Sequence, residues 1–164
     1  MRAAFALAGI VLVVAGCGAA TAASPPRSTA AGGPGVLMTR ILREEIHGQW
    51  ALQWKALHPA HQKLISEAQY VACSERMGTD FATGDEVFRV LDVRNEPIQV
   101  KGVPERVSKL VTITFHHPGK QKGLTYRMHA VNVNGRWAWI LGEKFLSAVA
   151  HGRCLDGSPL RATA

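Results

Sequence analysis

The stretch LTYRMHAVNVNGRWAWIL, residues 124–141, decides the fold class of this chain. Two runs rich in β-branched and aromatic residues flank Asn134-Gly135, and Asn-Gly between such runs is the strongest short-range signal for a β-hairpin with a two-residue turn. We therefore predict strands over 124–133 and 136–141. A two-residue turn also predicts the two faces: Trp137, Trp139 and Leu141 lie opposite Asn132, Ala130 and Met128 on one, and Val131, His129, Ala138 and Ile140 occupy the other.

The residues before this hairpin continue the period-two alternation that is typical of strands. The strongest predicted strand covers 107–116, another covers 87–93, and a short or edge strand covers 98–103. Turns are predicted at Asn95-Glu96-Pro97 and over 117–120. This succession of strands and short turns predicts an antiparallel meander.

Helical periodicity dominates the part of the chain that precedes the strands. Apolar residues recur every three to five positions over 37–57, which predicts an amphipathic helix of about five turns that ends before Pro59. A second helix is predicted over 59–77, with Gly78 as its stop and a loop over 78–85. A short helix or edge segment is predicted over 145–152, and 156–164 are expected to be a frayed tail.

The N-terminus has the pattern of an export signal. Arg2 is followed by an apolar stretch over 3–14 and by Ala15-Gly16-Cys17. The stretch is shorter than the roughly 20 residues that span a bilayer. The pattern resembles the lipobox of bacterial lipoproteins, which implies cleavage before Cys17, lipidation of its thiol and anchoring at the outer face of the cytoplasmic membrane. An ordinary secretory signal with a cysteine there by chance is the alternative.

Four regions follow from this pattern. Residues 1–16 are the expected signal peptide, and 17–35 are the lipidated cysteine with a tether rich in Ala, Gly, Pro, Ser and Thr, a composition typical of flexible linkers. Residues 36–155 are the expected α+β domain, and 156–164 the tail. The folded part has the size of a single domain.

The chain is basic, with a formal net charge of +7. Arg2 is the only charged residue of the signal, so +6 remains after its removal. Two interpretations of this excess are open: simple solubility, or attraction to an anionic envelope component, either lipid headgroups or wall polymers. We expect no nucleic-acid partner, because the predicted location is outside the cell and the basic residues form no dense run.

Three cysteines are present, and lipidation would occupy Cys17. Cys73 and Cys154 then form the one possible intramolecular pair in an oxidising compartment, and we predict a disulfide between them. Two buried free thiols or a metal site are the alternatives.

Helices followed by a long antiparallel meander predict an α+β architecture. The motifs WKALHPA (54–60), YVAC (70–73) and GRW (135–137), in this order of elements, resemble exported lipoproteins of unknown function with the NTF2-like, or SnoaL-like, cone fold. The resemblance covers about 37–154 and implies two or three N-terminal helices packed in a strongly curved antiparallel sheet. It implies no reaction, since that superfamily contains isomerases, cyclases, dehydratases and non-catalytic binders.

Few residues are candidates for chemistry. His129 and Asp92 are both expected in mid-strand, where an inward side chain could act as a base; alternation places Asp92 on one face with Phe88 and Val90. Both side chains facing solvent is the alternative. His58 and His61 flank Pro59 without a third ligand nearby, so a helix-entry capping role is favoured over a metal site. No metal and no cofactor is predicted.

Aromatic side chains supply the remaining candidates, either as core packing or as the lining of a cavity under a bent sheet. The predicted lining is Trp50, Trp54, Tyr70, Phe115, Tyr126, Met128, Trp137 and Trp139. These patterns favour a membrane-anchored, non-catalytic domain that binds a small apolar ligand or an anionic envelope partner. An isomerase or dehydratase with Asp92 or His129 as base is the alternative, and a purely structural accessory domain is the third.

Overall fold

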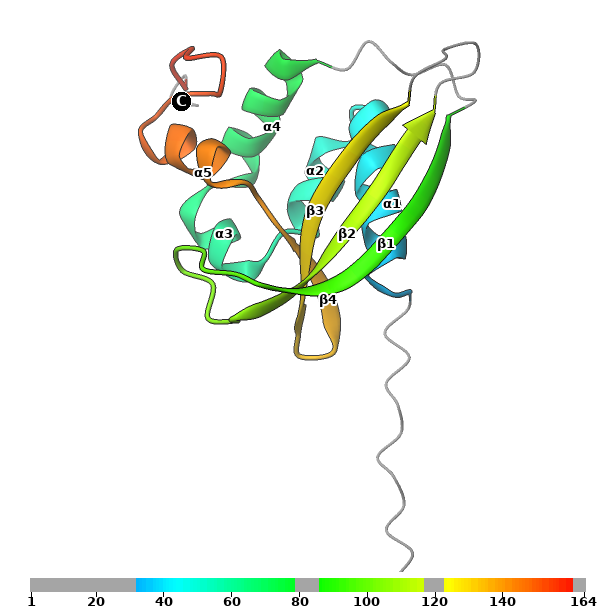
Figure 1. Cartoon of the computed structure of the whole chain (residues 1–164). Helices are drawn as coiled ribbons and strands as arrows, with labels where there is room; N and C mark the ends of the chain where they lie inside the picture. Colours follow the sequence, from blue (N-terminus) through cyan, green and yellow to red (C-terminus); the bar gives the residue numbers. More distant parts are fainter. Residues whose placement is uncertain (1–31, 79–85, 117–122, 161–164) are drawn as a thin grey trace, which may run out of the picture.

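The computed structural model describes residues 32–78, 86–116 and 123–160. Their elements follow the order α1 (Pro34–Ile46), α2 (Trp50–Lys55), α3 (Pro59–Leu64), α4 (Glu67–Met77), β1 (Val87–Pro97), β2 (Val107–His116), β3 (Leu124–Val133), β4 (Arg136–Ile140) and α5 (Glu143–Ala150). The strands form one antiparallel sheet in the order β1-β2-β3-β4 (Figure 1). The predicted α+β class and the meander are confirmed.

The β3–β4 hairpin forms as its sequence predicts. Asn134 has a φ of 52° and Gly135 a φ of 83°, the left-handed pair that a two-residue hairpin turn requires. Trp137 pairs with Asn132 and Trp139 with Ala130. Trp139 and Ala130 join the main core, whereas Val131 and Ile140 join a second cluster, so the two faces are those predicted.

The predicted bounds of β2 and β3 are confirmed, but those of β1 are wrong. β1 continues through Asn95 and Glu96 to Pro97, where we predicted a turn. An edge strand tolerates a proline at its end because one row of its N–H groups has no partner strand. The predicted strand over 98–103 is also wrong: this segment is irregular, and Val103 packs against Val131 and Ile140 on the outer face of the sheet.

A β-bulge at Leu91 changes the phase of β1. Val90 pairs with Ile113, and Asp92, two residues on, pairs with the adjacent Thr112, so Leu91 is the extra residue. A bulge shifts the inside–outside alternation of its strand by one position. Asp92 therefore lies on the opposite face from Phe88 and Val90, and the predicted sharing of one face is wrong.

Each of the two long predicted helices is divided in the structure. Gly48, with a φ of 64°, separates α1 from α2 because a residue in the left-handed region cannot continue a right-handed helix. Ser66 separates α3 from α4: its hydroxyl accepts from the backbone N–H of Gln69, whose side chain accepts in turn from the N–H of Ser66. This capping box starts a new helix. Met77 ends α4 at Gly78, as predicted.

The helices cover the inner face of the sheet, and the main core lies between the two layers (Figure 1). The segment after α2 also contacts the sheet directly. The Trp139 N–H donates to Ala56 O at 3.0 Å, and the His58 N–H donates to Trp139 O at 2.9 Å. These two bonds fix the start of α3 against β4.

The predicted disulfide between Cys73 and Cys154 is present, with a Cα–Cα distance of 5.2 Å. It joins α4 to the segment that follows α5. The tail is ordered further than predicted: the Leu160 N–H donates to Gly152 O at 2.7 Å and Cys154 N–H to Ser158 O at 2.8 Å. Residues 161–164 lie outside the described residues, as do the predicted signal peptide, Cys17 and most of the tether.

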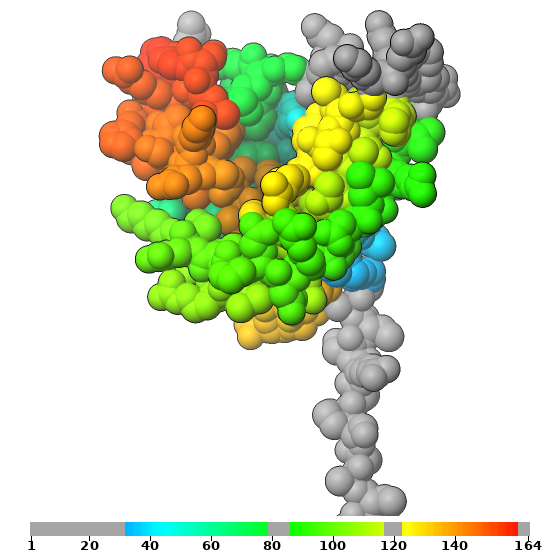
Figure 2. Space-filling model, viewed as in Figure 1, coloured from blue at the N-terminus to red at the C-terminus, as the bar shows by residue number. Residues whose placement is uncertain are grey.

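The sheet is open, and the strongly curved NTF2-like cone is not confirmed. β4 pairs with β3 from His129 onward, so Leu124–Met128 has no strand on that side in the described part of the chain. A recess lies between α5 and β3 there (Figure 2). No described helix has both the length and the apolar character needed to cross a membrane.

Candidate functional site: a cationic groove at the start of the domain

A groove of about 550 Å³ lies where α1 and α2 meet the β3–β4 turn. Its charged lining consists of the cations Arg40, Lys55 and Arg136 and the carboxylate Glu44. A second pocket of about 310 Å³ adjoins it, since both are lined by Arg40, Arg136 and Trp137. The volume is in the range of small-ligand sites, about 300–1,000 Å³. The excess of cations favours an anionic ligand.

Three different elements place the cations around this groove. Arg40 lies on the outer side of α1, Lys55 ends α2, and Arg136 opens β4 directly after the turn. The left-handed Asn134-Gly135 turn folds the hairpin back, so that Arg136 and Trp137 approach the first turns of α1. The groove therefore depends on the hairpin signal in the sequence and on the packing of α1 against β4.

Among the described residues that line the groove, Glu44 is the buried ionisable one, with 6% of its surface exposed. Its Oε1 lies 3.5 Å from Arg40 Nε, one helical turn earlier. Its Oε2 is buried without a hydrogen-bond partner among the described residues. Burial raises the pKa of Glu44, and the Arg40 guanidinium partly opposes that rise.

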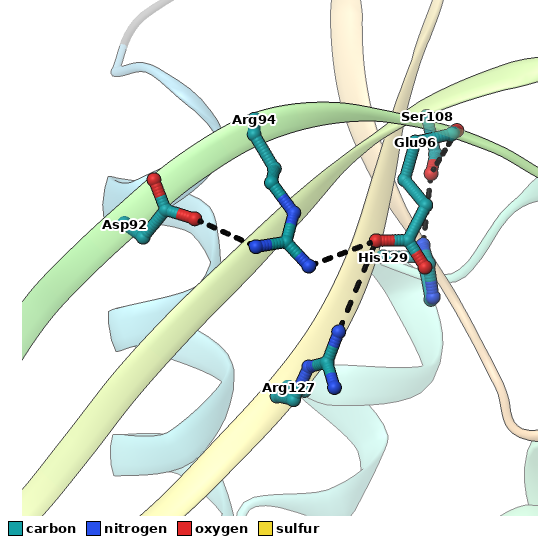
Figure 3. Close-up of polar contacts among 6 residues, drawn as sticks. All are labelled: Asp92, Arg94, Glu96, Ser108, Arg127 and His129. Atoms are coloured by element: carbon teal, nitrogen blue, oxygen red, sulfur yellow. Dashed lines mark hydrogen bonds and ion pairs between the residues drawn. The ribbon is translucent and has the colours of Figure 1, made fainter.

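The predicted catalytic candidates lie elsewhere, in a polar cluster on the outer face of the sheet (Figure 3). Arg94 contacts both Asp92 and Glu96 at 3.5 Å, and Arg127 lies 3.9 Å from Glu96. The Asp92 side chain is 47% exposed. Ion pairs this exposed stabilise a fold by about 0–1 kcal/mol. The cluster is a solvated charge network, and Asp92 belongs to it because of the bulge at Leu91.

His129 is half-buried at the edge of the same cluster, and its Nδ1 lies 2.8 Å from Ser108 Oγ. Burial lowers the pKa of His129; nearby Glu96 raises it and Arg127 lowers it further. The ring is therefore mainly neutral near pH 7. Ser108 is 2% exposed and also donates to Glu96 O, so its hydroxyl is a structural partner with little access for a substrate. Neither Asp92 nor His129 lines the groove.

Seven of the eight residues predicted to line a cavity belong to the main core or pack against it. The eighth, Phe115, is also buried and packs on the Phe88 ring, with centroids 5.3 Å apart. Tyr70 packs on Trp139 and Phe145, with ring centroids 6.4 and 5.6 Å apart. Of the eight, Trp137 alone lines the groove, and it also lines the adjoining pocket. In the described part of the chain these aromatic side chains act mainly as core packing.

The expected capping role of His58 is confirmed. Its Nδ1 accepts from the Ala60 N–H at 3.1 Å, and its Nε2 lies 3.1 Å from Glu105 Oε2. His61 is fully buried and its Nδ1 accepts from the Leu141 N–H at 3.2 Å. No set of three or more His, Cys, Asp or Glu side chains among the described residues is arranged to hold a metal ion.

Sequence reasoning missed most of the groove: Arg40, Glu44, Lys55 and Arg136 were not singled out. The spacing of Arg40 and Glu44, four residues apart in a helix, was a signal for an ion pair. The convergence with Arg136 depends on tertiary packing and had no local signal. In comparisons with known proteins, the chain has no significant match to a protein-family model, to a curated protein or to a solved structure.

Proposed function

We propose that this chain is an exported lipoprotein, anchored through a lipid on Cys17, whose folded domain is a non-catalytic binding module for an anionic envelope component. The groove carries the binding part of this proposal, because three cations from three elements converge on it. The lipobox-like sequence that ends at Cys17 carries the anchoring part.

The position of the groove fits an anchored protein. Gly32, which lines the adjoining pocket, follows Cys17 by 15 residues. A chain of that length spans at most about 50 Å when fully extended. The start of α1 and the β3–β4 turn lie at the same end of the molecule (Figure 1). A lipid on Cys17 would therefore keep the cationic groove close enough to reach an anionic surface. Attraction then acts where the groove comes within about 8–10 Å of that surface at physiological salt.

The placement of the predicted bases supports a non-catalytic domain. Asp92 lies in an exposed ion pair, and the His129 Nδ1 is engaged with Ser108. A base needs a substrate within hydrogen-bond reach in a site that excludes water. The isomerase or dehydratase alternative gains no support from this arrangement.

The NTF2-like assignment stays within this proposal. It is supported by the order of elements, helices first and a four-stranded antiparallel meander after them, and by the helical layer on one face of the sheet. The open sheet does not add to that support.

Cellular fractionation tests the anchor. We expect Cys17→Ala to leave the membrane fraction or to remain unprocessed, whereas membrane retention at unchanged mass would refute lipidation of this cysteine. Binding of the released Cys17→Ala chain to isolated envelopes tests the groove. We expect binding that weakens in 1 M salt, where the Debye length is about 3 Å, and that falls severalfold in the Arg40→Gln, Arg136→Gln variant.

A matched control carries the same loss of two charges outside the groove, in Lys144→Gln with Arg153→Gln. Both control residues are exposed and neither lines the groove. Equal loss of binding in the two double variants would show that overall charge, and not the groove, attracts the envelope.

A further inference from the structure

The groove contains two features that a site for a simple anion does not need. One is the buried Glu44 Oε2, which has no hydrogen-bond partner among the described residues. The other is the half-buried ring of Trp137, which lines both the groove and the adjoining pocket. Together with the cations, these groups define three kinds of contact within about 550 Å³.

The unpartnered oxygen of Glu44 can accept a hydrogen bond, so it favours a ligand that donates one. A carboxylate oxygen that is buried without a partner is unfavourable, because it has lost its hydrogen bonds to water. Arg40 Nε lies 3.5 Å from the other oxygen, and the Arg40 side chain is 58% exposed, so a ligand anion can reach it. A hydroxyl group suits the position better than an ammonium group, because Arg40 already pairs with this carboxylate and Lys55 and Arg136 line the same groove.

The aromatic ring of Trp137 favours a ligand with an apolar face. Its ring offers a flat surface beside the cations, and small-ligand sites combine such a surface with a few polar groups that fix orientation. Arginine binds phosphate oxygens through its planar fork of N–H donors, and Arg40 and Arg136 both reach the part of the groove next to this ring.

We propose, on the basis of the anion-binding role above, that the groove binds a phosphorylated cyclic polyol, a sugar or cyclitol phosphate. The phosphate contacts Arg40 and Arg136, a ring hydroxyl donates to Glu44 Oε2, and the C–H face of the ring packs on Trp137. Such a group occurs as a free or polymeric sugar phosphate and as the headgroup of an anionic lipid.

Isothermal titration of the full-length Cys17→Ala chain tests this with myo-inositol 1-phosphate, inorganic phosphate, myo-inositol and phosphoethanolamine. We expect inositol phosphate to bind at least tenfold more tightly than phosphate or inositol alone. Glu44→Met and Trp137→Leu should each remove most of that tenfold gain while phosphate affinity persists, which also shows that the groove is still folded. Arg136→Gln should weaken phosphate and inositol phosphate alike, whereas Lys144→Gln should leave both unchanged.

Vesicles distinguish the two sources of the ligand. Sedimentation with phosphatidylinositol vesicles, but not with phosphatidylcholine vesicles, and release by free inositol phosphate identify a lipid headgroup; binding of the free compound without sedimentation identifies a soluble or polymeric sugar phosphate. Equal affinity for phosphate and inositol phosphate, or tighter binding of phosphoethanolamine, would overturn the proposal. If envelope binding still depends on Arg40 and Arg136 in that case, the polyol assignment fails alone and the proposed function stands.

Discussion

The Tyr70 hydroxyl donates a 2.6 Å hydrogen bond to Gln53 Oε1, and this bond joins α4 to α2 inside the core. The same glutamine donates from Nε2 to Ile41 O at 2.7 Å, and its backbone carbonyl accepts from the Trp139 indole at 3.0 Å. Gln53 is 1% exposed. One buried residue, through its side chain and its backbone carbonyl, thus connects α1, α2, α4 and β4.

Replacement of Gln53 should therefore destabilise the protein strongly. Gln53→Leu keeps the approximate volume but removes the acceptor of the Tyr70 hydroxyl and the side-chain donor to Ile41 O. The loss of a buried hydrogen bond of this kind is unfavourable by about 1–3 kcal/mol for each group. We expect the free energy of unfolding, measured in urea, to fall by about 3 kcal/mol. The exposed Gln99→Leu is the matched control, with an expected change within about 0.5 kcal/mol.

Tyr70→Phe combined with Gln53→Leu tests whether the two groups act as a pair. Because either single change already removes the Tyr70–Gln53 bond, the double variant should be less destabilised than the sum of the singles. Strict additivity would contradict the importance of this bond.

The disulfide should contribute a large part of the stability. Cys73 and Cys154 are separated by 81 positions, and closing a loop of that size stabilises a fold by about 4 kcal/mol in the chain-entropy model. We expect Cys73→Ala, Cys154→Ala to lower the urea midpoint by a corresponding amount. Dithiothreitol should lower the stability of the wild type and leave the double variant unchanged; two reactive thiols in the native exported protein would contradict the pairing.

Stability should fall in acid because of His61. Burial and the neighbouring His58 lower the pKa of His61 from 6.5 to about 4. The folded protein then keeps this ring neutral while the unfolded chain takes up a proton below about pH 6.5, so the unfolded state gains stability between about pH 6.5 and 4. The loss amounts to at most about 3 kcal/mol, since one pKa unit corresponds to about 1.4 kcal/mol.

Denaturant unfolding at several pH values isolates this contribution. His61→Gln offers an acceptor to the Leu141 N–H without titrating, so its stability should depend less on pH than that of the wild type over this window. The exposed His151→Gln is the control and should retain the wild-type slope. If the free energy of unfolding has the same pH dependence in the wild type and in His61→Gln, the pKa of His61 is the same in the folded and unfolded states.

Local sequence signals predicted the elements whose causes are local. Asn134-Gly135 specifies its own turn through backbone conformation, and the pairing of Trp137 and Trp139 follows from it. The alternation over 107–116 fixes β2 because that strand is central and half of its side chains are buried. Helix breaks were harder, since Gly48 and Ser66 are tolerated in many helices and act here through one φ angle and one capping box.

The candidate site could not be predicted from the sequence, for a different reason. Arg40 and Arg136 are 96 positions apart, and no period or motif relates them before α1 packs on β4. Asp92 was misplaced because a bulge leaves no mark in the alternation of polar and apolar residues. A single extra residue, Leu91, moved the strongest carboxylate candidate from the inner face to the outer one.

Deletion of Leu91 tests that account of β1. The residues on either side already pair with adjacent positions of β2, Val90 with Ile113 and Asp92 with Thr112, so removal of Leu91 converts the bulge into a regular strand without moving any other side chain to the other face. Leu91 is 53% exposed, so little buried apolar surface is lost. We expect the free energy of unfolding to change by less than about 1 kcal/mol.

Deletion of Thr112, in the central strand, is the control: it shifts half of β2 by one position, turns core side chains toward solvent and should prevent folding. A loss of stability as large as that of the Thr112 deletion would contradict the assignment of Leu91 as the extra residue of β1.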